Sequence, residues 1–389
     1  MKGKITPPIL FKLAKCPSVM NFAVRGFVRR GLTASLYYRR KDNVSLAPLA
    51  YNLKITNACN LRCKMCAQWG ERGYNFTRPS SEIKQIVPLE TYKKMIDDIK
   101  HLKPAVYIWG GEPFLYPPLM DLMKYIKKNK LVLELVTNGV RLEENAESIV
   151  DMGLEGLMVS VDGPRDVHDE VRGVKGTFDK LMAGLERVKE FKKKKNSRYP
   201  NIVFFSTICK ENAAYFDKIT DVGEEMGIDM MVIYPSWFTT EEIGRKHTAL
   251  MERELGCTPS TWKGYVNSFS EDDIAAISST VKRIHQKKFS FPVMWLPNLE
   301  EHEVERYYRE PEQTFNYKKC LAPWSMTEIM PNGDVVPCRD YSDFVVGNIA
   351  EKSIIDIFND EGYRKFRGLL KKHGGLIPIC ARCCGLMGY

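Results

Sequence analysis

The stretch "ACNLRCKMCAQW", residues 58–69, places three cysteines within eight positions, namely Cys59, Cys63 and Cys66. They directly follow an apolar run over 49–56 that predicts a β-strand. Thiolates are soft ligands that suit zinc or iron–sulfur clusters, but a closed zinc site uses four protein ligands. A four-iron cluster held by three thiolates leaves one iron with an open coordination position. We therefore expect a small molecule to be the fourth ligand.

Strand and helix patterns alternate after this first strand. Apolar runs rich in β-branched and aromatic residues predict five more strands, over 105–110, 131–137, 156–161, 202–208 and 230–234. Helical spacing of apolar residues occurs between them, over 88–102, 176–191 and 213–227. This alternation predicts an α/β fold with a parallel sheet and helices outside it. Because six strands are too few for an eight-fold barrel, we expect a partial (β/α)6 barrel, with its chemistry at the C-terminal strand ends.

The excess of positive charge lies in the N-terminal segment. The chain has 389 residues, 44% of them hydrophobic and 27% charged, as in an ordinary globular protein. Ten of the 58 Lys and Arg lie in residues 1–41, which hold no acidic residue, so the other 48 balance the 48 Asp and Glu. A neutral body argues against a nucleic-acid-binding face. The basic arm also carries apolar residues, so it fits an anionic membrane surface; the alternative is an arm packed on the body with its cations solvated.

Export and membrane signals are missing from the sequence. No apolar run reaches the roughly 18 residues that a spanning helix needs, and the first segment lacks a continuous apolar core of a signal peptide. We therefore expect a cytoplasmic protein, with peripheral contact to the inner face of the membrane through residues 1–41 as an option. Eleven cysteines in such a chain favour thiolate ligands over a disulfide framework.

The Cys-x3-Cys-x2-Cys spacing after a first strand resembles the signature of radical S-adenosylmethionine (radical SAM) enzymes. The resemblance implies that SAM chelates the open iron of a [4Fe-4S] cluster and that an electron from this cluster cleaves SAM. The products are methionine and a 5′-deoxyadenosyl radical, which abstracts hydrogen from a substrate. It further implies a flavodoxin- or ferredoxin-type electron donor, and a protein that mainly positions the cofactors and excludes water.

Three other strand ends support the resemblance. "WGGEPFLYP" (109–117) resembles the glycine–glycine–glutamate–proline motif that binds the SAM amino group, because glycines allow close approach and a carboxylate accepts from an ammonium. "TNG" (137–139) ends the third strand, and "SVDGPRDVHDEVRG" (160–173) resembles the stretch that contacts the SAM ribose and carboxylate. Taken singly, the Asn-Gly and Asp-Gly pairs are ordinary turn dipeptides. The resemblance implies cofactor contacts at Gly110, Gly111, Glu112, Pro113, Asn138, Ser160, Asp162 and Arg172.

One position departs from the family pattern. The residue before the third cysteine is commonly aromatic in these enzymes and packs near the adenine. Here it is Met65, whose polarizable thioether also packs on aromatic faces. We keep Met65 as a cofactor contact and make no claim of adenine stacking.

The C-terminal cysteines resemble the SPASM/twitch extension of radical SAM enzymes. "IMPNGDVVPC" (329–338) predicts a hairpin with an Asn-Gly turn. The resemblance, nearer to the shorter twitch pattern, implies one auxiliary [4Fe-4S] cluster that handles an electron in a net oxidation or bond-forming step. Cys384 is an alternative last ligand, and a structural zinc is the alternative metal. The implied ligands are Cys320, Cys338, Cys380 and Cys383.

We expect four parts: a basic extension (1–48), the barrel (49–255), a helical linker (256–317) and the cluster domain (318–389). A capping-box pattern at Ser270 and Asp273 predicts a helix over 270–288 within the linker. The expected substrate is a small molecule, a lipid or a peptide. The alternatives are a peptide-modifying SPASM maturase and a non-catalytic metal-bound scaffold that binds nucleic acid or membrane through its arm; no nucleic acid is expected. Substrate-side candidates are Trp109 and Trp324, with Tyr234, Arg339 and Asp340 as catalytic candidates.

Overall fold

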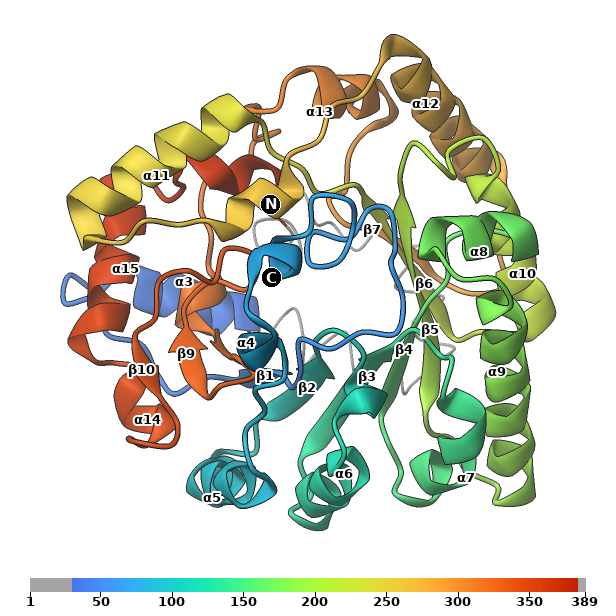
Figure 1. Ribbon diagram of the computed structural model, residues 1–389, viewed down its shortest axis with the longest axis horizontal. Helices are drawn as coiled ribbons and strands as arrows, with labels where there is room; N and C mark the ends of the chain where they lie inside the picture. Colours follow the sequence, from blue (N-terminus) through green and yellow to red (C-terminus); the bar gives the residue numbers. More distant parts are fainter. Residues whose placement is uncertain (1–29, 384–389) are drawn as a thin grey trace.

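The computed structural model describes residues 30–383 of the chain. Most of the basic arm, with Cys16, and the alternative ligand Cys384 lie outside the described residues. The fold is one sheet of ten strands in the order β10-β9-β8-β1-β2-β3-β4-β5-β6-β7, which curves into a partial barrel that does not close (Figure 1). The predicted α/β partial barrel is confirmed.

All six predicted strands are present and pair in parallel with their neighbours along the chain. Each begins and ends within two residues of its predicted bounds. They are β1 (Ala50–Lys54), β2 (Ala105–Trp109), β3 (Val132–Thr137), β4 (Gly156–Ser160), β5 (Asn201–Ile208) and β6 (Met230–Pro235).

Helices cover the outer face of this sheet (Figure 1). In α5 (Leu89–Ile99), four residues at helical spacing are buried, so the apolar stripe predicted from the sequence faces the strands. The other covering helices are α6 (Leu119–Lys128), α7 (Leu142–Asp151), α8 (Arg165–Arg172), α9 (Thr177–Lys194) and α10 (Ile219–Met226).

The helix predicted over 213–227 begins late, at Ile219. The reason is Asn212, whose side chain donates to the Asp162 carbonyl at 2.9 Å and accepts from the Cys209 amide at 2.8 Å. An asparagine that bonds to the backbone in this way holds a turn in place of a helix.

The two faces of β1 differ in polarity because alternate residues point to opposite faces. Tyr51 and Leu53 belong to the core under the helices. Asn52 and Lys54 are also fully buried but are polar, and they point the other way. The interior of the barrel is therefore partly polar, which prepares it for chemistry.

Four further strands extend the sheet beyond the predicted six. β7 (Val293–Trp295) pairs in parallel with β6, inside the segment that the sequence predicts as a helical linker. The predicted hairpin forms between β8 (Met326–Ile329) and β9 (Asp334–Val336), and β10 (Gly347–Asn348) pairs with β9. Because β8 also pairs in parallel with β1, the C-terminal part shares the sheet of the barrel.

The remaining helices lie in the connections that follow β1 and β6 and in the C-terminal part of the chain. The predicted capping box is present at the start of α12 (Glu271–Gln286), where Ser270 and Asp273 bond to each other's backbone amides. The others are α4 (Ser80–Ile83), α11 (Glu241–Leu255), α13 (Val304–Arg309), α14 (Ile354–Ile357) and α15 (Glu361–Lys372).

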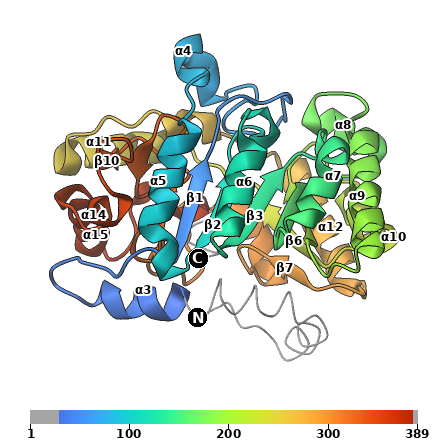
Figure 2. The same cartoon turned by 90° about the horizontal axis from the view of Figure 1, so that it is seen from below.

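The described end of the basic arm is α3 (Arg30–Tyr38), which lies at the end of the molecule opposite α4 (Figure 2). Ala34 is buried and Tyr38 packs on Trp324 with ring centroids 4.8 Å apart. Leu32 and Leu36, one helical turn apart, are 65% and 67% exposed. Across residues 30–383, every helix is too short or too polar to cross a membrane.

Candidate active site

Two glycines after β2 contact the backbone of the segment that leads into the three-cysteine loop. The Gly111 amide donates to the Thr56 carbonyl and the Glu112 amide to the Ala58 carbonyl, both at 2.8 Å. A Cβ on Gly111 would lie 2.1 Å from the Ala58 oxygen, and one on Gly110, with φ of 153°, 2.6 Å from the Thr56 oxygen. Only glycine fits such a close approach of two backbones. The glycine pair therefore fixes where the loop starts.

The middle of the loop is attached to the end of α8. The Arg62 amide donates to the Arg172 carbonyl at 3.2 Å, and the Lys64 amide donates to the Val171 carbonyl at 2.9 Å. The Lys64 ammonium also pairs with Glu170 at 2.7 Å. As a result the thiols stand beside the C-terminal ends of both β2 and β4.

Arg172 connects this loop to the end of β4. Its guanidinium forms an ion pair with the fully buried Asp162 and lies 3.6 Å from the Sγ of Cys63. Burial raises the pKa of Cys63 to about 11, and the nearby Arg172 opposes that shift. Burial likewise raises the pKa of Asp162, and Arg172 again opposes it. The Nε of Arg172 is buried without a hydrogen-bond partner in the described part of the chain.

Glu112 ties the end of β2 to the end of β3. Its carboxylate is buried and accepts from the Thr137 hydroxyl at 2.7 Å, the Asn138 amide at 2.8 Å and the Phe114 amide at 3.2 Å. Burial raises the pKa of Glu112, and these hydrogen bonds oppose the shift. The carboxylate is thus held by the polypeptide itself.

A cavity opens beside the three cysteines. Glu112, Pro113 and Asp162, predicted as cofactor contacts, stand outside its lining, where they support the residues that form the wall. The remaining predicted residues come together around it: Cys59, Cys63, Met65, Cys66, Gly110, Gly111, Asn138, Ser160 and Arg172.

Aromatic side chains form much of the opposite wall. Trp109 and Tyr234 are there, as predicted, and Tyr234 packs edge-on against Phe205 at 5.5 Å and Trp237 at 5.1 Å. Trp324 is elsewhere, fully buried against α3. Four further lining residues were not predicted: Tyr107 and Phe205, for which the period-2 alternation of their strands was a signal, and Trp237 and Tyr265, which lie outside the strands and gave none.

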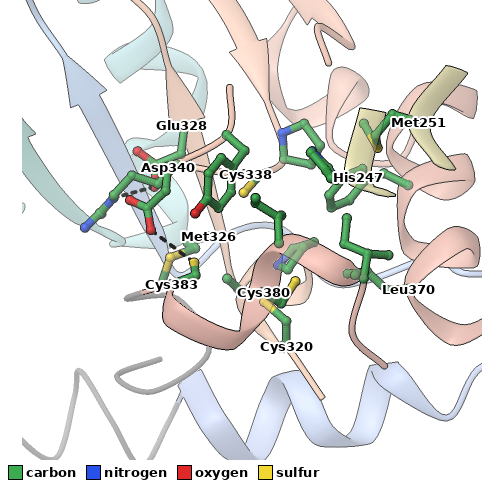
Figure 3. Close-up of a pocket in the computed structure, with 18 residues that line it drawn as sticks. His247, Met251, Cys320, Met326, Glu328, Cys338, Asp340, Leu370, Cys380 and Cys383 are labelled. Atoms are coloured by element: carbon green, nitrogen blue, oxygen red, sulfur yellow. Dashed lines mark hydrogen bonds and ion pairs between the residues drawn. The ribbon is translucent and has the colours of Figure 1, made fainter. Parts of the chain in front are cut away.

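A second cavity is lined by the four predicted auxiliary cysteines (Figure 3). Three separate segments contribute these cysteines, which are Cys320, Cys338, and the neighbouring Cys380 and Cys383. The Cys383 thiol donates to the Asp340 carboxylate at 3.0 Å. Burial raises the pKa of Cys380 to about 11 and raises that of Cys338 strongly. The sequence analysis missed a further lining residue, His247 of α11.

Arg339 and Asp340 line both cavities and so form the wall between them. The Arg339 guanidinium lies over the rings of Tyr107 at 4.9 Å and Trp109 at 5.3 Å. It pairs with Glu328 at 3.1 Å. Two of the three catalytic candidates therefore stand where the two sites meet, while Tyr234 lines the first cavity alone.

Comparison with known proteins agrees with this geometry. Residues 53–221 match the radical SAM superfamily, and residues 320–384 match the SPASM iron–sulfur cluster-binding domain. The chain belongs to the radical SAM superfamily and carries a C-terminal SPASM domain.

Individual relatives match over most of the chain. A tungsten-containing aldehyde ferredoxin oxidoreductase cofactor-modifying protein from Pyrococcus furiosus is 24% identical over 85% of this chain and 86% of its own length. An AdoMet-dependent heme synthase from Methanosarcina barkeri is 26% identical over 87% and 91%. Among solved structures, Streptococcus suis SuiB bound to S-adenosylmethionine has a TM-score of 0.58 at 17% identity, covering 82% of this chain and 68% of that one. SuiB bound to its precursor peptide SuiA gives 0.57 at 17% identity, with 89% and 73% covered.

The chain is accordingly an enzyme of the radical SAM class, with SAM and [4Fe-4S] clusters as its cofactors. The residues present fit these groups. Three thiols adjoin a cavity that is also lined by Arg172, whose guanidinium is suited to an anionic ligand group. Four thiols, one of them buried and three half-buried, line the second cavity, where they can supply the thiolate ligands of a cluster.

Proposed function

We propose that this enzyme holds SAM at a [4Fe-4S] cluster on Cys59, Cys63 and Cys66, and oxidises a substrate bound between that cluster and an auxiliary one. The cluster and SAM, when bound, supply reductive cleavage to methionine and a 5′-deoxyadenosyl radical that takes hydrogen from the substrate. The observation that carries the proposal is the shared wall: Arg339 and Asp340 border both cavities. A substrate beside this wall is within reach of both sites.

The residues around the first cavity have separate tasks in this proposal. Arg172, which lines the cavity, binds the carboxylate of SAM through its guanidinium, while Asp162 holds the guanidinium in place. Gly110 and Gly111 set the position of the loop, and backbone atoms there and the Asn138 and Ser160 side chains face the ligand. Glu112 and Pro113 are positioning residues behind the wall. The aromatic wall excludes water from the reacting atoms.

The second site is proposed to hold one auxiliary [4Fe-4S] cluster on Cys320, Cys338, Cys380 and Cys383. A zinc ion bound at about 2.3 Å by each thiolate would need sulfur atoms roughly 3.8 Å apart. Within residues 30–383, no three Cys, His, Asp or Glu side chains group around one ion position. The match of residues 320–384 to the SPASM iron–sulfur cluster-binding domain supports a cluster at these thiols.

For the substrate, we propose a flat cofactor-like molecule that bears carboxylates, such as a tetrapyrrole. Aromatic walls stack planar conjugated ligands, and arginine is suited to carboxylates; both Arg172 and Arg339 face the cavity. The heme synthase and the cofactor-modifying relative match over nearly their whole lengths. A peptide is the second candidate, because SuiB, which shares the fold, has been solved with a precursor peptide.

Anaerobic reconstitution tests the proposal. About eight irons per chain, and 5′-deoxyadenosine after dithionite reduction with SAM, support two clusters; about four irons with one zinc would contradict the auxiliary assignment. Fe-coproporphyrin III is the substrate probe, followed by its Soret band. Arg339→Gln should weaken its binding at least tenfold, whereas the surface variant Arg187→Gln, on α9, should leave it unchanged. Equal binding in both variants would exclude the Arg339 contact.

We also propose an external one-electron donor of the flavodoxin or ferredoxin type, since reductive cleavage of SAM needs an electron. The same proposal places the protein in the cytoplasm, with its N-terminal arm on the inner face of an anionic membrane. Leu32 and Leu36, exposed together on α3 next to the basic segment, support this attachment.

A further inference from the structure

Two buried side chains line the four-cysteine cavity and carry polar atoms that have no hydrogen-bond partner within residues 30–383. His247 of α11 is 2% exposed, and neither ring nitrogen makes a hydrogen bond within the described residues. Tyr341 is 5% exposed, and its hydroxyl is also unpartnered there. Both residues line the cavity that holds Cys320, Cys338, Cys380 and Cys383.

Buried polar groups in folded proteins are nearly always hydrogen-bonded, so two such orphans beside one cavity point to a bound acceptor. The two rings are neighbours, with centroids 5.9 Å apart. Tyr341 lines the same cavity as Cys338 and Cys383. Figure 3 shows His247 and Cys338 around the same space.

We propose that the Tyr341 hydroxyl and one ring N–H of His247 donate hydrogen bonds to sulfur atoms of the auxiliary cluster and thereby raise its reduction potential. The inference rests on the proposed ligand set of the second site. Hydrogen bonds to the sulfurs are among the features that set a cluster's potential. Reduction adds negative charge to the cluster, so the two bonds strengthen and favour the reduced form.

The protonation state of His247 is consistent with one donor. Burial lowers the pKa of His247 to about 4, so the imidazole is neutral and carries a single N–H. The packing of α11 against α15 and the C-terminal turn holds this ring at the cavity. The two donors thus reach the site from different segments of the chain.

The test is a potentiometric titration of the reconstituted full-length enzyme, followed by EPR of each cluster. Tyr341→Phe and His247→Leu each remove one donor, and His247→Gln restores an N–H. Tyr92→Phe is the matched control, because Tyr92 also has a buried, unpartnered hydroxyl but lies in the core under α5. We expect the auxiliary midpoint to become more negative in the first two variants, to return partly in His247→Gln, and to stay unchanged in Tyr92→Phe.

The outcomes distinguish the two proposed hydrogen bonds from the proposed ligand set of the second site. The SAM-binding cluster should keep its midpoint in every variant, and Cys59→Ala/Cys63→Ala/Cys66→Ala identifies which signal belongs to the auxiliary site. An unchanged auxiliary midpoint in Tyr341→Phe and His247→Leu, at full iron content, overturns the inference while leaving the ligand set intact. Loss of auxiliary iron in His247→Leu would make His247 a ligand and overturn its donor role. A wild-type enzyme with zinc there overturns the ligand set itself.

Discussion

The guanidinium of Arg172 lies 3.6 Å from the Sγ of Cys63, although 109 residues separate them in the chain. The same guanidinium pairs with Asp162, which is fully buried. The Arg172 cation therefore interacts with both a buried carboxylate and a thiol of the loop. Its positive charge stabilises negative charge on that thiol. The ends of β1 and β4 are joined electrostatically as well as through the backbone.

Replacing Arg172 should destabilise the fold as well as the site. Arg172→Met leaves Asp162 buried without its partner, and breaking a buried pair in this way costs about 3–5 kcal/mol. Adding Asp162→Asn removes the stranded charge, so the double variant should be more stable than Arg172→Met alone. Urea unfolding of the apoprotein measures both; additive losses in the two single variants would show that the pair is not coupled.

Replacing a cysteine of the three-cysteine loop should remove one cluster and leave the other in place. Cys63→Ala should lose about four irons and all 5′-deoxyadenosine formation, since the open-site cluster needs every protein thiolate. Cys257→Ala is the control, because this thiol bonds to the Asp343 carbonyl at 3.5 Å and lines neither cavity. Iron analysis decides: equal iron in the two variants would contradict the assignment of Cys63.

The glycine pair should be needed for the loop even before SAM binds. Gly111→Ala places a Cβ 2.1 Å from the Ala58 oxygen, so the segment that leads into Cys59 must shift. We expect the reconstituted variant to hold less than half of the wild-type iron at the first site. Gly31→Ala in α3 meets nothing within 4 Å and should keep full iron. Normal iron in Gly111→Ala would show that the loop adapts.

Local sequence patterns predicted the barrel strands well because each is short, apolar and followed by a turn. They also predicted the cysteine spacing, since the motif is contiguous. The pairing of β8 with β1 was out of reach because it joins segments more than 270 residues apart and depends on how the sheet curves. β7 was missed because three residues are too few to show a period.

At the candidate site too, contiguous motifs could be predicted from the sequence, whereas contacts between distant segments could not. The sequence named Glu112, but its donors come from Thr137 and Asn138 of the next strand, so its role as a tie between strand ends could not be predicted. His247 gave no signal at all. It sits on an ordinary amphipathic helix, and only tertiary packing turns it toward the cysteines.

The basic arm should bind anionic vesicles through residues next to α3. Deleting residues 1–41 would also remove Tyr38, which packs on Trp324, so a cleaner test deletes residues 1–29 and combines this with Leu32→Ser and Leu36→Ser. Flotation with phosphatidylglycerol vesicles should fall severalfold in the altered protein and should weaken with salt. Undiminished flotation would rule out the membrane contact.

Glu328 should make stability depend on pH in the direction opposite to that of most carboxylates. Burial raises its pKa to about 7 from 4.5, although Arg339 and Asn52 oppose the shift. Because the folded state holds this proton more tightly than the unfolded state, the contribution of Glu328 is most favourable below pH 4.5 and is lost as the pH rises through 7.

Glu328→Gln removes this titration, so the variant should gain stability relative to wild type between pH 5 and pH 8, by about 2.5 kcal/mol. Urea unfolding at several pH values measures the difference, with the exposed Glu186→Gln on α9 as the control that should show none. A constant difference between Glu328→Gln and wild type across this range would mean that Glu328 keeps an ordinary pKa. Arg339 would then hold a carboxylate that is mostly charged at pH 5 and fully charged at neutral pH, at the wall between the two cavities.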